Sequence, residues 1–264
     1  MPLILNFNKI LSRFSLEIVN RRDLDKLVYA ASVNRNIKSP QASSMPDPFD
    51  DQKYLVKKSS PVIFDVGSYV GEIACKYAKN FPDASIYAFE PTPTSYNELE
   101  KKTHKINNIQ IFNFALSDTN NKCQFYLNKF SPTNSMLAPS SKAHNVWGNG
   151  LVETQETINV DCTTLDEFCK YKHIDHIDIL KIDVQGGELN VLRGANDILK
   201  DGRIDLIYTE IIFAETYQNQ ITVTDLLKFM DSSNFQLFNF YNPKYLNRRL
   251  IQADLIFVNQ NLVK

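Results

Sequence analysis

Short apolar runs alternate with helical patterns from residue 61 onward, and this alternation is what most constrains the fold. Runs rich in β-branched and aromatic residues predict strands, and amphipathic stretches between them predict helices. The predicted strands are 61–65, 86–90, 109–115, 177–183 and 204–210, and the predicted helices are 73–81, 95–105 and a segment around 189–199. Strands that alternate with helices form a mostly parallel sheet covered on both faces, so we expect an α/β fold. Segments 235–241 and 254–259 predict strands that add an antiparallel edge.

The composition is that of an ordinary globular protein. Of 264 residues, 43% are hydrophobic and 22% are charged, which excludes a disordered chain. The formal net charge of −1 argues against a nucleic-acid binder, and no apolar stretch approaches the roughly 18 residues of a membrane span. The cysteines show no metal-like spacing and are expected to be reduced thiols, which indicates a cytoplasmic protein.

Residues 1–60 differ in character from the rest. Apolar residues at helical spacing predict a helix over about 1–32, which we expect to pack on its own domain. A contact between copies in an oligomer and a contact with a membrane surface are the alternatives. From 33 to 60 the chain is polar and contains Pro40, Pro46 and Pro48, which predicts a linker or an irregular wrap. We therefore expect an N-terminal extension over 1–60 and a single domain over 61–264.

Acidic residues stand at the ends of several predicted strands. Asp65, Glu90, Asp183 and Glu210 each close an apolar run. Ligands of open α/β sheets bind outside the carboxyl ends of the strands, and a carboxylate at that edge costs stability unless it is paired or used. The sequence thus predicts that these carboxylates meet at one functional rim.

The turn after the first strand points to an adenosine cofactor. Glycine is scarce in this chain, yet Gly67 and Gly71 both follow the predicted strand, in the pattern Asp-x-Gly-x-x-x-Gly. A strand, a glycine turn and a helix start allow backbone N–H groups to approach a ligand closely. Glu90 lies about 20 residues further on, where an acid binds ribose hydroxyls. The third glycine of the dinucleotide fingerprint is absent, which favours S-adenosylmethionine over NAD.

A second glycine pair follows the strand 177–183, in the segment from Lys181 to Glu188. The strand delivers Asp183 to the rim, the glycines turn the chain, and Glu188 opens a helix. The helix dipole explains an acid at that position, whereas it does not explain Asp183.

These motifs resemble the FkbM family of S-adenosylmethionine-dependent methyltransferases over about 61–258. The matching segments are FDVGSYVG (64–71), FEP (89–91), ALSD (115–118), TTLDEF (163–168), LKIDVQGGELNVLRGA (180–195) and ADLIFV (253–258). The resemblance implies a class I methyltransferase, Rossmann-like sheet of seven strands and O-methylation, often of sugars. Gln185 departs from it, because such proteins often carry glutamate there.

The resemblance also implies the cofactor site. The residues expected to bind S-adenosylmethionine are Asp65, Gly67, Ser68, Tyr69, Gly71, Glu90, Pro91, Ala115, Leu116, Asp118 and Asp183. Asp65 and the glycines would frame the methionine end, Glu90 would hold the ribose, and the 115–118 segment would lie along the adenine.

The polar segment 120–156 is expected to be an insertion on the substrate side. Its candidate substrate-binding residues are Asn134, Ser135, His144 and Trp147. An exposed tryptophan in a polar loop is a rigid platform for a sugar ring, although Trp147 would serve equally well as an anchor of the loop.

No metal site is predicted from the histidines. His173 and His176 lie three residues apart, but no third ligand is near them in sequence, so an ordinary loop is expected. A divalent cation held by carboxylates at the rim would acidify a hydroxyl, yet no motif demands one.

The predicted reaction is methyl transfer to a hydroxyl oxygen, most naturally of a sugar in a glycan, glycolipid or natural product. A general base would assist a weakly acidic hydroxyl, and Asp183 and Glu210 are the candidates, with Glu188 third. One alternative is a Rossmann-type NAD-dependent oxidoreductase. The other is a non-catalytic protein that binds the cofactor or a glycan, for which Gln185 is the only hint.

Overall fold

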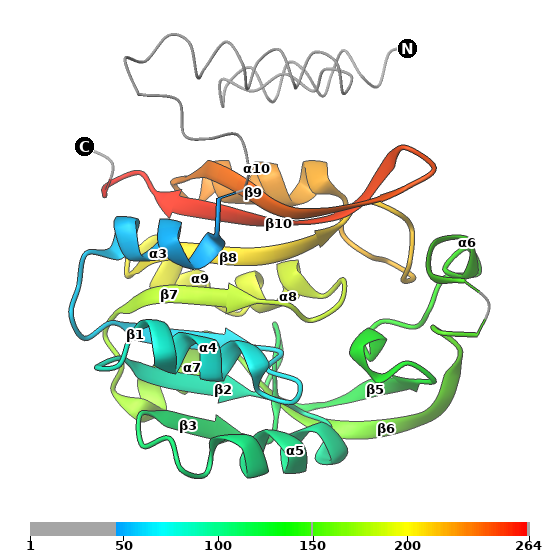
Figure 1. The fold of residues 1–264 in the computed structure, drawn as a ribbon, viewed down its shortest axis with the longest axis horizontal. Coiled ribbons are helices and arrows are strands. Elements are labelled where there is room, and N and C mark those ends of the chain that lie inside the picture. The colour runs from blue at the N-terminus through cyan, green and yellow to red at the C-terminus, as the bar shows by residue number, and fades with distance from the viewer. Residues whose placement is uncertain (1–45, 149, 263–264) are drawn as a thin grey trace, which may run out of the picture. The chain divides into compact units, whose positions relative to one another are not determined.

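The computed structural model describes residues 46–148 and 150–262, and its centre is a seven-stranded sheet of order β3-β2-β1-β7-β8-β10-β9 (Figure 1). The strands are β1 (Val62–Val66), β2 (Ser85–Phe89), β3 (Ile109–Phe112), β7 (Ile177–Ile182), β8 (Ile204–Ile212), β9 (Phe235–Leu246) and β10 (Arg249–Asn259). β10 runs antiparallel to both of its neighbours, β8 and β9, and the other pairings are parallel. The predicted mostly parallel sheet with an antiparallel edge is thereby confirmed.

Helices cover both faces of this sheet (Figure 1). They are α3 (Pro48–Val56), α4 (Glu72–Asn80), α5 (Pro93–Thr103), α7 (Leu165–Lys172), α8 (Glu188–Arg193), α9 (Asn196–Lys200) and α10 (Val223–Ser232). α3 and α4 lie on the face toward the viewer in Figure 1, and α7 and α9 lie behind. The helix predicted around 189–199 is divided, because the chain turns at Gly194 and Ala195 between α8 and α9.

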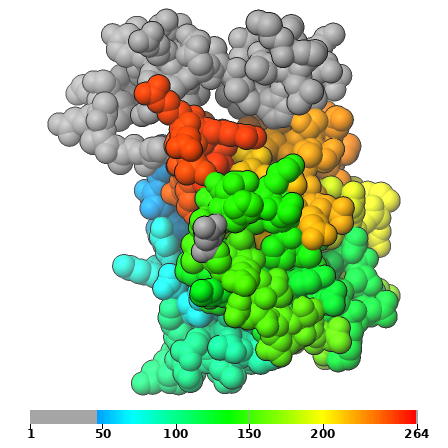
Figure 2. Space-filling view, turned by 90° about the vertical axis from the view of Figure 1, so that its right-hand side faces the viewer, coloured from blue at the N-terminus to red at the C-terminus, as the bar shows by residue number. Residues whose placement is uncertain are grey.

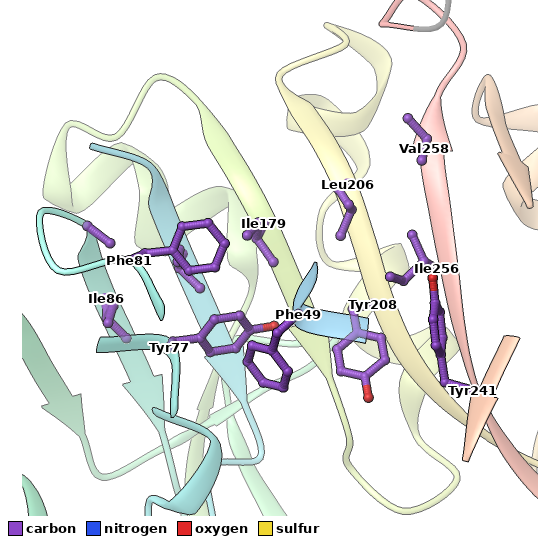
Figure 3. Close-up of a cluster of buried hydrophobic side chains, with 12 residues drawn as sticks. Phe49, Tyr77, Phe81, Ile86, Ile179, Leu206, Tyr208, Tyr241, Ile256 and Val258 are labelled. Carbon is purple, nitrogen blue, oxygen red and sulfur yellow. The ribbon is translucent and has the colours of Figure 1, made fainter. Parts of the chain in front are cut away.

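The main core cluster lies between the sheet and the helices α3 and α4 (Figure 3). Phe49 of α3 packs against Tyr77 of α4, with ring centroids 5.0 Å apart, and side chains of the six strands β1, β2, β7, β8, β9 and β10 complete the cluster. The buried hydroxyl of Tyr77 donates a hydrogen bond to Gln52 at 2.9 Å. Burial of this much apolar surface holds the strands rigidly, which a site at their ends requires.

The segment expected to be an irregular wrap contains a helix. In α3, Asp47 is the N-cap and accepts a hydrogen bond from the Phe49 N–H at 2.8 Å, and Pro48 occupies the first turn. Proline is favoured there because the first N–H groups of a helix have no partner within it. Pro48, one of the prolines that predicted a linker, therefore marks a helix start, and the compact unit that contains the sheet includes this helix.

A smaller sheet stands beside the main one. Its order is β4-β6-β5, formed by β4 (Ala115–Leu116), β6 (Thr154–Thr163) and β5 (Lys122–Asn128). The amino-acid sequence of the insertion predicts a short strand over 123–127, which is confirmed as β5, whereas β6 was not expected. The predicted strand 109–115 is divided into β3 and β4, because Asn113 turns the chain and donates hydrogen bonds to the carbonyls of Glu90 and Pro91.

Between β5 and β6 the insertion forms a short 3₁₀ turn, η2 (Ser131–Thr133), and a helical turn, α6 (His144–Trp147). The predicted helix over 1–32, with its expected contacts, lies outside the described residues. None of the helices within 46–148 and 150–262 has the length and apolar character to cross a membrane.

Candidate active site

A cavity of about 380 Å³ opens at the carboxyl ends of β1, β2, β7 and β8. The loops after these strands form its floor, and the small sheet and the β9–β10 hairpin form its walls. Figure 2 shows the face on which the insertion, in green, lies directly below the red-orange end of that hairpin. The volume suits a small-molecule ligand, and the location is the one expected for open α/β sheets.

Many of the predicted site residues line this cavity. They are Gly67, Tyr69, Glu90, Pro91, Ala115, Leu116, Asn134, Trp147, Asp183 and Glu210. The predicted residues that do not line it are Asp65, Ser68, Gly71, Asp118, Ser135, His144 and Glu188.

Glu90 follows β2 and is held in one orientation by its neighbours. One carboxylate oxygen accepts hydrogen bonds from the Thr92 N–H at 2.9 Å and the Thr92 hydroxyl at 2.5 Å. The other accepts from the Tyr69 N–H at 3.0 Å. Burial raises the pKa of Glu90, and the hydrogen bonds from Thr92 and Tyr69 oppose that rise. An oriented carboxylate with lone pairs left over is suited to accept hydrogen bonds from a ligand diol.

The turn between β1 and α4 brings backbone close to the cavity. Gly67 has a φ of +79°, and a Cβ atom there would lie 1.9 Å from the carbonyl oxygen of Asp183. Only glycine allows the two chain segments to approach so closely. Tyr69 also has a positive φ, of +49°, and its hydroxyl lies 2.8 Å from the Ser131 hydroxyl across the cavity. The turn thus joins the main sheet to the insertion.

Asp65 is not at the rim, contrary to the prediction. β1 continues to Val66, and the Asp65 side chain is 0% exposed, with the ammonium of Lys181 on β7 2.8 Å away. Lys181 also donates to the Gly67 carbonyl at 2.8 Å. Burial disfavours the charge on Lys181, but the carboxylates of Asp65 and Asp183 outweigh it and raise the pKa of the ammonium. The pair supports the glycine turn from below and does not contact the cavity.

Glu188 is also turned away from the cavity. Its side chain is 2% exposed, and one carboxyl oxygen accepts hydrogen bonds from the Gly186 N–H at 3.0 Å and the Val184 N–H at 3.2 Å. Burial raises the pKa of Glu188 to about 7. The side chain closes the turn before α8, which is a structural role, and it does not line the cavity, so Glu188 is not placed to act as the base.

The remaining predicted residues outside the cavity have local structural contacts. The Ser68 hydroxyl donates to the Asp65 carbonyl, and a Cβ atom on Gly71 would lie 2.6 Å from Leu99 of α5. Ser135 is buried beneath the floor. Asp118 and His144 are exposed to solvent. The direction of each of these side chains depends on neighbours in the folded structure, and the spacing of residues along the sequence does not reveal them.

Asp183 and Glu210 come together at the floor of the cavity. Asp183 follows β7, and one of its oxygens accepts a hydrogen bond from the amide of Gln185 at 2.9 Å. Glu210 lies in β8, and its two oxygens accept from the amides of Gln185, at 2.8 Å, and Gln252. Burial, followed by the negative charges of Asp183 and Glu188, raises the pKa of Glu210 well above its ordinary value.

The walls contain residues that the sequence did not single out as site residues. Lys244 of β9 and Gln252 of β10 line the cavity, and the Lys244 ammonium lies 3.3 Å from the Gln252 amide oxygen and 5.9 Å from the ring centre of Trp147. Phe130 and Met136 of the insertion add apolar surface. Lys244 and Gln252 were not predicted as site residues, because the pairing of β10 with β8 and β9 is what brings them to the cavity.

One cluster of potential metal ligands lies at the opposite ends of the strands. His176 Nε2 is 2.9 Å from Asp205 and 3.9 Å from Asp178. The ammonium of Lys58 lies 3.0 Å from both oxygens of Asp178, and the Val62 N–H donates to one of them at 2.6 Å. The ammonium of Lys58 already pairs with Asp178, and Asp205 contacts His176, so we interpret the cluster as a polar network that ties the chain before β1 to β7 and β8.

In a comparison with known protein families, residues 65–237 of the chain match the methyltransferase FkbM domain. The 2-O-methyltransferase NoeI of Sinorhizobium fredii is 27% identical over 186 residues, which cover 67% of this chain and 74% of that protein. The hexuronic acid methyltransferase AglP of Haloferax volcanii is 26% identical over 151 residues, 57% of this chain and 55% of that protein. Because the domain match covers well over half of the sequence, the chain belongs to the FkbM methyltransferase family and is an S-adenosylmethionine-dependent methyltransferase.

Proposed function

We propose that this protein transfers a methyl group from S-adenosylmethionine to a hydroxyl oxygen of a sugar. The observation that carries the proposal is the lining of one cavity. It contains Glu90, whose oriented carboxylate can accept hydrogen bonds from a ribose diol, and the two acidic residues Asp183 and Glu210. The names of the relatives NoeI and AglP, which describe 2-O-methylation and methylation of a hexuronic acid, support the same chemistry.

The lining suits S-adenosylmethionine in chemical character. Glu90 has the geometry to accept both ribose hydroxyls, and Phe89, Phe114 and Leu116 form an apolar wall against which an adenine ring can stack. The carboxyl oxygens of Asp183 and Glu210, both in the cavity lining, can contact the positive sulfonium. When bound, S-adenosylmethionine supplies an electrophilic methyl group.

Asp183 is the better placed of the two candidate bases. Its Oδ1 accepts from Gln185, and within residues 46–148 and 150–262 its Oδ2 has no hydrogen-bond partner. Both oxygens of Glu210 are held by side-chain amides. Asp183 Oδ2 is therefore the atom that takes the proton from the sugar hydroxyl. Glu210 orients the amide of Gln185, which in turn holds Asp183. Alignment of the hydroxyl by the cavity wall contributes the rest of the rate enhancement.

The insertion supplies the acceptor wall. The indole N–H of Trp147 donates to the Thr216 hydroxyl at 3.1 Å, so one edge of the ring is anchored while the side chain lines the cavity. Phe130, 43% exposed, lines the same cavity. Aromatic side chains of this kind pack against the apolar faces of sugar rings.

The direct test is methyl transfer from labelled S-adenosylmethionine to a panel of sugars, with and without uronic acids. We expect label on an oxygen of at least one sugar. The sugar is digested without prior permethylation, and mass spectrometry locates the methyl group. Label on nitrogen or carbon acceptors would contradict the proposal. Cofactor binding without turnover on any sugar would favour the non-catalytic alternative.

Glu90→Ala is expected to weaken binding of S-adenosylhomocysteine by about 1–3 kcal/mol, because a charge-assisted hydrogen bond to the ribose is lost. Isothermal titration calorimetry measures the change. Glu98→Ala, an exposed acid on α5, is the matched control and should bind as the wild type does. An unchanged dissociation constant for Glu90→Ala would remove Glu90 from the cofactor site.

Trp147→Ala is expected to raise KM for the sugar about fivefold and to leave cofactor affinity unchanged, because the lost aromatic contact is worth about 1 kcal/mol. Trp147→Phe keeps a ring at this position but loses the bond to Thr216, so it separates stacking from anchoring. If Trp147→Ala lowers the melting temperature and leaves KM alone, the residue anchors the insertion and is no sugar platform.

A further inference from the structure

Gln185 joins the two carboxylates at the floor of the cavity. Its amide nitrogen lies 2.9 Å from Asp183 Oδ1 and 2.8 Å from Glu210 Oε2. A primary amide carries two N–H hydrogens, so each carboxylate receives one. One side chain thus connects the residue after β7 to β8.

The surroundings of Gln185 hold this amide in a defined orientation. The hydroxyl of Tyr217, which is buried, lies 3.1 Å from the amide oxygen and also 2.8 Å from the Thr133 carbonyl. The Ser135 hydroxyl donates to the Gln185 carbonyl at 2.8 Å. Gln185 has a φ of +57°, which a residue with a side chain adopts only where its neighbours compensate the cost. The amide oxygen therefore faces a hydroxyl donor and the nitrogen faces the acceptors.

Two carboxylates this close in a poorly solvated floor repel one another. Glu188 and Asp254 add negative charge near Glu210, and Lys244 and Lys181 add positive charge near the pair. The two N–H hydrogens of one amide donate to both carboxyl groups without adding a charge. A glutamate at position 185 would instead gather acidic groups around one point, which is the arrangement that hard divalent cations bind.

We propose that Gln185 is a positioning residue, whose single amide bridges Asp183 and Glu210 and keeps Asp183 Oδ2 available to the acceptor hydroxyl in place of a bridging cation. This inference rests on the proposed function in one respect, namely that Asp183 is the base. The bridge itself is a property of the folded chain and is measurable without an acceptor.

The first experiment compares Gln185→Glu with Gln110→Glu, a matched substitution at an exposed position of β3. The added carboxyl at 185 would have a folded-state pKa above its unfolded value of about 4.3, so its contribution is favourable below that value and is lost as the pH rises. We expect the melting temperature of Gln185→Glu to be lower than that of the wild type by about 5–10 °C at pH 8 and by much less at pH 5. Gln110→Glu should follow the wild type throughout.

Manganese provides a second readout with the same proteins. Millimolar MnCl₂ should raise the melting temperature of Gln185→Glu at pH 8 and leave the wild type and Gln110→Glu unchanged. Stabilisation of the wild type by MnCl₂ that Asp183→Asn removes would show a cation site at the floor and would overturn the proposal. Equal behaviour of Gln185→Glu and Gln110→Glu across pH would overturn it as well.

A third measurement tests positioning through the reaction. Gln185→Met retains bulk but loses both donors, so Asp183 should lose its fixed orientation, and kcat should fall while KM for the sugar stays the same. With the first sugar that turns over, we expect a loss in kcat of about tenfold at pH 7 and an unchanged affinity for S-adenosylhomocysteine. A wild-type kcat, or a loss confined to KM, would contradict the proposal. Absence of S-adenosylhomocysteine binding by the wild type would instead refute the proposed function, and the stability measurements would still test the bridge.

Discussion

Asp183→Asn is expected to lower kcat by about 10²–10⁴, the usual effect of removing a general base. Asparagine keeps an oxygen that can accept the hydrogen bond from Gln185, so the floor of the cavity should persist while the proton acceptor is lost. Single-turnover assays with a sugar identified in the panel measure the chemical step. Calorimetry with S-adenosylhomocysteine reports separately whether the cofactor still binds.

Glu210→Gln serves as the comparison. Both oxygens of Glu210 already accept from amides, so its replacement should perturb the floor and lower kcat less than Asp183→Asn does. A larger effect at Glu210 would reverse the assignment of the base. Wild-type rates in both variants would refute the mechanism with a carboxylate base. Alignment of the sugar hydroxyl with the methyl group would then be the remaining source of catalysis.

Lys181→Met is expected to reduce the free energy of unfolding by about 3–5 kcal/mol, because it leaves the charge of Asp65 buried without its partner. The Asp65 side chain is 0% exposed, and the Lys181 ammonium also donates to the Gly67 carbonyl. Urea denaturation measured at pH 7 gives the change. The loss should greatly exceed the effect of Lys101→Met, which removes an exposed pair with Glu98 and should cost no more than about 1 kcal/mol.

The double variant Asp65→Asn with Lys181→Met separates charge burial from packing. It should recover a large part of the stability that Lys181→Met loses, because no unpaired charge remains. If the double variant is as unstable as the single one, the lysine stem and its bond to Gly67, and not the ion pair, stabilise the turn.

Several site residues were predictable because local sequence determines their position. Glu90 stands directly after a strand and was expected at the rim, and the structure places it in the cavity. Gly67 was expected to permit a close approach, and its α-carbon lies against the Asp183 backbone. In both cases the strand direction and the following turn decide where the residue goes, and both follow from short-range patterns.

Other predictions failed because the sheet as a whole decides where a strand ends and to which side its last side chain points. Asp65 looks like Glu90 in sequence, yet β1 extends one residue further and the carboxylate is paired with Lys181, more than 100 residues away in sequence. Pro48, which predicted a linker, lies in the first turn of α3. The β6 strand has few apolar residues, and its pairing with β4 and β5 makes it a strand.

The sequence by itself determined the α/β alternation, the glycine turn after β1, the acid after β2 and the family, because these depend on residues that are close in the chain. The tertiary structure alone decided which acids reach the cavity and which are neutralised in the interior. It also decided that Gln185 and Gln252 hold Glu210, and that Lys244 lies beside Trp147. The physical reason is that the energy of a buried charge depends on partners brought together by folding, and their distance along the chain does not reveal them.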